Sequence, residues 1–174
     1  MSQIKYKIPI EITVAYLAAF SLILGIEYLN LPVWAVFVTW AGYFALGADR
    51  EAFIAIYKAV PLGGIFGFIA VIGFDYLIKA MPFVHWLIPS MIVEFIDVLI
   101  LMYIITRFNF VGGAVFWAFA SYFGTYYGGF YNSLGSLWGD AASALLSEMI
   151  ANFLGPIRLS KHKALITICR KEVI

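Results

Sequence analysis

The chain has 174 residues, of which 64% are hydrophobic and 12% are charged. Because soluble globular domains average about 45–50% apolar and about 25% charged residues, this composition excludes an ordinary soluble domain and a disordered chain. The net charge of +1 provides no basic field for nucleic acid, so we expect no nucleic-acid partner. A mean hydropathy of +0.95, spread along the whole length, indicates a polytopic membrane protein.

Six apolar segments match the length of membrane-spanning helices, since a hydrocarbon core of about 30 Å requires about 20 helical residues. The segments are residues 10–28, 31–47, 57–79, 83–105, 110–127 and 137–155. The third segment could begin as early as Glu51 and bend at Pro61. We therefore predict an all-α fold, a polytopic bundle of six transmembrane helices over residues 1–156, followed by a basic cytoplasmic tail over residues 157–174.

The basic residues predict the orientation of this bundle. With six crossings, both termini lie on one side, and only Lys79 falls on the other side. The residues on the side of the termini are Lys5, Lys7, Arg50, Lys58, Arg107, Arg158, Lys161, Lys163, Arg170 and Lys171. By the positive-inside rule both termini are cytoplasmic. The bases of the tail alternate with apolar residues, as in a helix that lies on anionic lipid.

The two halves of the chain, about residues 10–79 and 83–156, are similar to each other. At an offset of 79 positions, residues 36–44 align with residues 115–123 and share five of nine residues. Each half contains an odd number of predicted crossings, so the second copy enters the membrane from the opposite face. The sequence thus predicts an inverted repeat of three plus three helices, an architecture found in several channels and transporters.

The same stretches carry a family resemblance. Residues 31–45, the Pro-Leu-Gly-Gly of residues 61–64 and the later block 110–116 resemble a family of small prokaryotic inner-membrane proteins catalogued as domain of unknown function 1097. The resemblance covers roughly residues 10–156 and implies a compact multi-span protein of the inner membrane. It supplies no substrate and no site residues. The chain departs from the family pattern in carrying several acidic residues inside its apolar segments.

These acidic residues are the first candidate functional groups, because carboxyl groups inside a membrane are costly to insert. Glu94 and Asp97 lie near the middle of the fourth segment, and their i, i+3 spacing puts both on one helical face. Glu148 lies near the middle of the sixth segment. The alternative is that these side chains hold helices together through hydrogen bonds. Asp75, by contrast, is expected to pair with Lys79 at i+4.

Polar and aromatic residues complete the candidate path for a solute. Half of the circumference of the sixth segment is polar, so it is expected to face a partner helix, an oligomer interface or water. Its polar residues are Asp140, Ser143, Ser147, Glu148 and Asn152. Asp140 is placed at the outer rim, where solvation alone would also explain it. Tyr43 and Phe44 match Tyr122 and Phe123 in the repeat, although close helix packing explains such aromatic residues as well.

The function predicted from these features is a channel or transporter for a small solute, with a path between the two halves. Acidic linings favour a cation or a proton. The alternative is a membrane scaffold or accessory subunit that binds a partner through its polar helix face. No motif for an enzyme, a cofactor or a metal is found. We expect the lipid bilayer as surroundings and a homo-oligomer as the assembly.

Overall fold

The computed structural model describes residues 10–25 and 30–171, with most side chains of these residues up to residue 154. Residues 1–9 and 26–29 of the predicted membrane domain, and residues 172–174 of the predicted tail, lie outside this part. The described residues form α1 (Ile10–Ser21) with a short 3-10 helix (Leu22–Gly25), α2 (Val33–Ala45), α3 (Arg50–Ala80), α4 (Leu87–Arg107), α5 (Gly112–Tyr127) and α6 (Leu137–Lys171). They include no strand, so the predicted all-α class is confirmed.

Two helices continue through proline or glycine residues at which the sequence predicts a bend or an end. Pro61 lies inside α3, which is assigned as one helix from Arg50 to Ala80. Proline is tolerated in an apolar helix when neighbouring elements satisfy the freed backbone groups. The sixth helix also continues, through Gly155 and Pro156 to Lys171, whereas the sequence predicts its end near residue 155. Residues 157–171 of the predicted tail are therefore a continuation of α6.

A tight turn reverses the chain between α2 and α3. Gly47 and Ala48 both have positive φ angles, of 97° and 52°, the left-handed region in which glycine carries no steric penalty. Asp49 then caps α3, because its side chain accepts a hydrogen bond from the Ala52 amide at 2.8 Å. This turn makes α3 fold back directly after the short helix α2.

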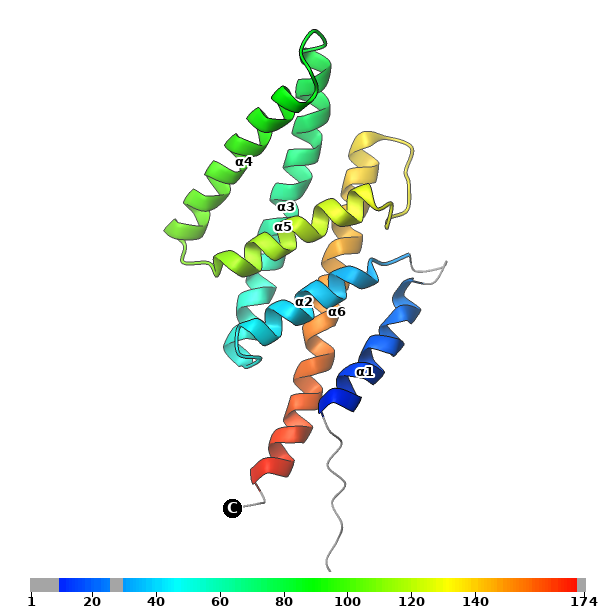
Figure 1. Cartoon of the computed structure of the whole chain (residues 1–174), viewed down its shortest axis with the longest axis vertical. Helices are drawn as coiled ribbons and strands as arrows, with labels where there is room; N and C mark the ends of the chain where they lie inside the picture. Colours follow the sequence, from blue (N-terminus) through cyan, green and yellow to red (C-terminus); the bar gives the residue numbers. More distant parts are fainter. Residues whose placement is uncertain (1–9, 26–29, 172–174) are drawn as a thin grey trace, which may run out of the picture.

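The centre of the molecule consists of α2, α3, α5 and α6. The short helices α2 and α5 cross the long helices α6 and α3, and α3 also contacts α6 (Figure 1). Helix α4 lies on the outer side of α3 and, among the described helices, contacts mainly α3 and to a small extent α5, while α1 packs beside α2. The main apolar core joins side chains of α2, α3, α4, α5 and α6, among them Val36, Ile56, Leu101, Val115 and Ala151.

Small residues let these helices approach closely. A Cβ atom added to Gly63 of α3 would lie 2.7 Å from both the Cβ of Ala118 and the backbone nitrogen of Phe119 in α5. At that distance a side chain larger than hydrogen would require the helices to move apart. The α3–α5 contact thus depends on glycine, as close contacts between apolar helices commonly do.

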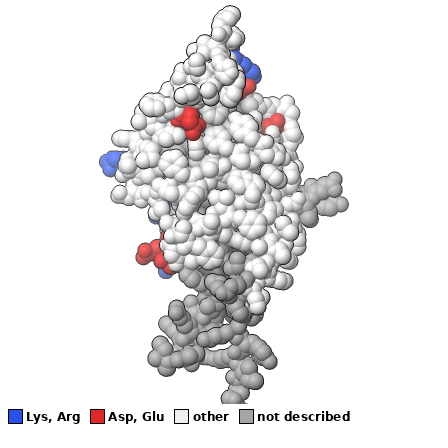
Figure 2. Space-filling view, in the orientation of Figure 1, with Lys and Arg blue, Asp and Glu red and all other residues white. Residues whose placement is uncertain are grey.

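The surface is largely apolar. Figure 2 shows charged side chains at a few scattered places on a face that is otherwise uncharged. Among the described helices, α3 and α4 are long and apolar enough to cross a membrane, and α2 is a shorter apolar helix. Only 22% of the apolar stretch of α4 is buried, unlike the core helix of a soluble protein. The two helices therefore suggest that the protein associates with a membrane.

Candidate functional site

Four polar side chains from three helices meet in the apolar centre of the molecule. They are Thr39 of α2, Ser121 of α5, and Glu148 and Asn152 of α6, with exposed fractions of 5%, 0%, 0% and 1%. Glu148 and Asn152 are one turn apart on α6, so both point to the same side of the helix. We refer to these four residues as the central cluster.

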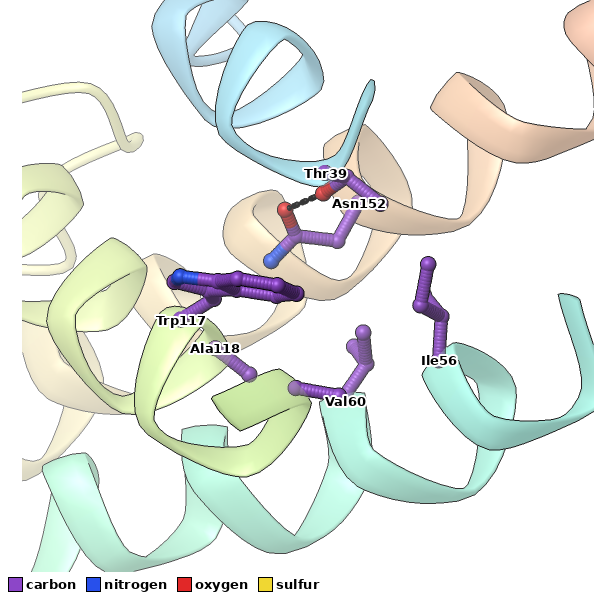
Figure 3. A pocket seen from close by; sticks show the side chains of 7 residues that line it. Thr39, Ile56, Val60, Trp117, Ala118 and Asn152 are labelled. Atoms are coloured by element: carbon purple, nitrogen blue, oxygen red, sulfur yellow. Dashed lines mark hydrogen bonds between the residues drawn. The ribbon is translucent and has the colours of Figure 1, made fainter. Parts of the chain in front are cut away.

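Asn152 connects the central cluster. Its Nδ2 donates hydrogen bonds to Ser121 Oγ at 3.2 Å and to Glu148 Oε1, and its Oδ1 accepts one from the Thr39 hydroxyl (Figure 3). The Thr39 hydroxyl also lies 2.9 Å from the carbonyl oxygen of Ala35, within its own helix. A single amide therefore links α2, α5 and α6.

Glu148 is the member of the central cluster whose hydrogen-bonding capacity is not filled. Its Oε2 is buried and has no hydrogen-bond partner, and a Cβ added to Gly64 of α3 would lie 2.9 Å from this atom. Within the described residues, the one ion pair joins Lys79 to Asp75 at 2.7 Å, which confirms that predicted pair. Glu148 is thus buried without an ion-pair partner among the described residues. Burial of such a carboxyl costs free energy, so its presence indicates a functional role.

A small cavity adjoins the central cluster. It has a volume of about 10 Å³ and is lined by Thr39 and Asn152 together with Ile56, Val60, Trp117 and other side chains (Figure 3). This volume is close to the minimum that holds one water molecule. The centre of the molecule is therefore closely packed in this conformation.

The other two polar candidates of α6 have different surroundings. Ser147 is 8% exposed, and its Oγ has no hydrogen-bond partner. Asp140 lies at the start of α6, where its Oδ1 accepts hydrogen bonds from the Leu134 amide at 2.6 Å and from Ser133 Oγ at 3.1 Å. Asp140 thus holds the loop that precedes α6, and Ser147 lies one position before Glu148.

Glu94 and Asp97 form a second acidic group, apart from the central cluster. Both lie on α4, and α3 and α5 lie between α4 and α6 (Figure 1). Asp97 is 5% exposed and its Oδ2 has no hydrogen-bond partner, while Glu94 is half-buried. The two residues are three positions apart on α4 and share one helical face. The structure thus does not bring this pair together with Glu148.

The four aromatic candidates occupy matching positions of the repeated stretches but differ in burial. Tyr43 and Tyr122 are 3% and 0% exposed, and each hydroxyl donates to a backbone carbonyl, that of Ala48 at 2.9 Å and that of Ala141 at 3.1 Å. Phe44 is 40% exposed. Phe123 is partly buried and contacts the rings of neighbouring aromatic residues. The two tyrosines therefore join their helices to nearby backbone.

Sequence reasoning did not include Thr39, Ser121 and Asn152 among the candidate path residues. Asn152 was visible as part of the polar face of the sixth segment. Thr39 and Ser121 are the hydroxyl residues, tyrosine aside, of the repeated stretches 36–44 and 115–123, which is the signal that could have identified them. In the part of the chain that the structure describes, no group of three His, Cys, Asp or Glu side chains could hold a metal ion.

The fold and the site define a class of protein: an all-helical protein with apolar helices suited to a membrane and a buried polar cluster at its centre. The family model described as protein of unknown function (DUF1097) matches residues 11–158, and the chain belongs to this family. The predicted resemblance is thereby confirmed. Neither the curated proteins nor the solved structures include a match to the chain.

Proposed function

We propose that the protein is a membrane transporter for a small solute, with the central cluster as its binding element and with the structure in a closed conformation. The observation that carries this proposal is Glu148, a fully buried carboxyl with a free Oε2 and no described cation partner. Ionisable residues in membrane segments commonly mark ion pathways and proton relays. The small cavity of about 10 Å³ beside the cluster favours a carrier that opens by helix movement over a permanently open channel.

The inverted repeat is part of this proposal. Helix α5 packs on α3 as α2 packs on α6, and α2 contacts α5, which is the exchange of partners that a two-fold axis generates. At the crossing of these two helices, Trp34 of α2 covers Gly124 of α5, and Trp117 of α5 covers Gly42 of α2. In this arrangement the central cluster lies at the interface of the halves, where inverted-repeat transporters bind their solutes.

A cation or a proton fits the central cluster best. The side chains of Thr39, Ser121, Asn152 and Glu148 provide hydroxyl, amide and carboxyl oxygens, and all four are buried. Such oxygens replace the hydration shell of a cation or carry a proton, while an anion would meet the unpaired oxygen of Glu148. Helix movement at the glycine contacts of α3 and α5 would expose the cluster to one side of the membrane and then to the other.

The proposed setting is the prokaryotic inner membrane, with six crossings and both termini in the cytoplasm. The distribution of the 11 basic residues, ten of them on one side, supports this orientation by the positive-inside rule. Helix α5, with 16 residues, is shorter than the usual span, and local thinning of the bilayer accommodates such a helix. The exposed apolar face of α4 is then covered by lipid or by a second copy in a homo-oligomer.

A scaffold or accessory subunit is the second candidate function, and the close packing of the centre favours it. In that case the hydrogen bonds of Asn152 only hold α2, α5 and α6 together, as polar side chains do in apolar bundles. A partner protein would then bind at the surface, and no solute would pass between the halves.

Reconstitution in liposomes separates the two candidates. The flux of protons and of alkali cations is measured for the wild type, for Glu148→Gln and for Asp75→Asn, whose carboxyl pairs with Lys79 far from the cluster. We expect ion flux in the wild type and in Asp75→Asn. In Glu148→Gln the flux should fall to that of liposomes without protein. Equal flux in all three proteins removes Glu148 from the mechanism, and the absence of flux for a broad panel of solutes favours the scaffold.

A further inference from the structure

A groove of about 500 Å³ lies outside the central cluster, between the first turns of α3 and the connection from α4 to α5. Its apolar wall consists of Ile54, Ala55, Phe108, Phe110 and Val111, and its polar residues are Glu51, Lys58 and Asn109. The groove is thus amphipathic, with one cationic side chain beside a mainly apolar wall.

The charges around the groove favour an anionic group. Lys58 is exposed, and neither Lys58 nor Arg107, which directly precedes Phe108, is in an ion pair with the described residues. Glu51 lies in the first turn of α3, where a carboxylate is stabilised by the positive end of the helix dipole. Lys58 is therefore available to a ligand in the groove, and phosphate is an anion that such a side chain commonly binds.

The apolar wall of the groove includes exposed side chains. Phe108 is 67% exposed, Ile54 is 41% exposed and Val111 is 37% exposed. A small soluble anion would leave this apolar wall exposed to water, whereas the acyl chain of a lipid would bury it. Basic pockets between helices at the cytoplasmic face are typical sites for the head groups of anionic lipids.

We propose that this groove binds an anionic phospholipid, with its phosphate at Lys58 and its acyl chain along Ile54, Phe108 and Val111. The proposal rests on the membrane setting described above and is independent of transport. A bound lipid would join the start of α3 to the α4–α5 connection. It would therefore stabilise the folded protein in proportion to its occupancy.

The test measures the thermal unfolding midpoint of the delipidated protein in a neutral detergent. Phosphatidylglycerol, phosphatidylcholine or inorganic phosphate is added to the wild type, to Lys58→Gln and to Lys79→Gln, whose cation lies at the other end of α3. We expect phosphatidylglycerol to raise the midpoint more than the other two additives do in the wild type and in Lys79→Gln. In Lys58→Gln most of this specific rise should be lost, and Lys58→Arg should restore it.

Three results would overturn the proposal. They are an equal rise with both lipids, a rise that Lys58→Gln leaves unchanged, and a full rise with inorganic phosphate alone, which would indicate a simple anion site. If Lys58→Gln does not fold, Val111→Ser decides, because serine is well tolerated at the N-cap position that Val111 occupies. This variant should weaken the effect of phosphatidylglycerol, and an unchanged effect would count against the acyl-chain contact.

Discussion

Trp34 of α2 lies across Gly124 of α5, so closely that a Cβ atom added to Gly124 would be 2.5 Å from Trp34 Cζ2. The reverse contact also exists, because a Cβ added to Gly42 of α2 would be 2.6 Å from Trp117 Cζ3. Each short helix thus presents an indole to a glycine of the other. Since α2 and α5 contribute Thr39 and Ser121, this pair of contacts fixes two walls of the central cluster.

Gly124→Ala should destabilise the protein, because the new methyl group overpacks the contact with Trp34 at a cost of about 1–3 kcal/mol. The higher helix propensity of alanine, about 1 kcal/mol in a helix interior, offsets part of this cost. Gly113→Ala is the matched control on the same helix, since the nearest atoms to its Cβ are 3.9 Å away. Unfolding in detergent measures both variants, and equal stability of the two would contradict the close contact.

Gly63→Ala should be more damaging than Gly124→Ala. The added methyl group would meet the carbonyl oxygen of Val115 and the backbone nitrogen of Phe119, and backbone atoms cannot rotate away as an indole can. We therefore expect the helices α3 and α5 to separate and the unfolding midpoint to fall further. A smaller loss for Gly63→Ala than for Gly124→Ala, in the same detergent, would show that the α3–α5 interface adapts easily.

Asn152→Ala should destabilise the protein by about 1–3 kcal/mol, the usual consequence of leaving buried polar partners unsatisfied. Thr39, Ser121 and Glu148 would each lose the bond to the amide. A double-mutant cycle with Thr39→Val then measures their coupling, for which we expect about 0.5–3 kcal/mol between contacting residues. Additive losses would mean that the hydrogen bonds do not act as a network.

Asp140→Ala should loosen the loop before α6, because it removes the acceptor of the Leu134 amide and of the Ser133 hydroxyl. Hydrogen exchange of residues 131–136 should become faster, with little change in α3 or α5. Asp75→Asn serves as the control for the loss of a carboxylate elsewhere. If exchange in the loop stays as in the wild type while solute selectivity changes, Asp140 belongs to an entrance rather than to the loop.

The sequence predicted the helical class and the positions of most helices because apolar segments and turn residues are local signals. It also indicated that the polar face of the sixth segment meets a partner helix, an oligomer interface or water, and Asn152 of this face bonds to Thr39 of α2 and Ser121 of α5. The end of α6 was predicted wrongly, since Gly155 and Pro156 read as a stop. A helix continues past such residues when its surroundings satisfy the backbone, which a local pattern does not reveal.

The partners of Asn152 could not be predicted in the same way. Its bonds to Thr39 and Ser121 join positions that are 113 and 31 residues apart, and they depend on how α2 and α5 cross α6. The separation of Glu94 and Asp97 from Glu148 has the same origin. All three carboxyls lie at similar depth in their predicted segments. The arrangement of the helices places α3 and α5 between the pair on α4 and Glu148 on α6.

Cysteine accessibility along α6 tests the central claim, a solute path at the interface of the halves, most directly. In a Cys169→Ser background, Ser147→Cys and Ala151→Cys report on positions that are 8% and 0% exposed, while Leu146→Cys and Ile150→Cys report on positions that are 63% and 48% exposed. A membrane-impermeant thiol reagent, which reacts with thiolates in water, is applied to protein in its native membrane. We predict labelling at the buried positions 147 and 151 and protection by lipid at the exposed positions 146 and 150. Labelling confined to the ends of α6, with positions 147 and 151 unreactive, would contradict a path and identify the central cluster as packing.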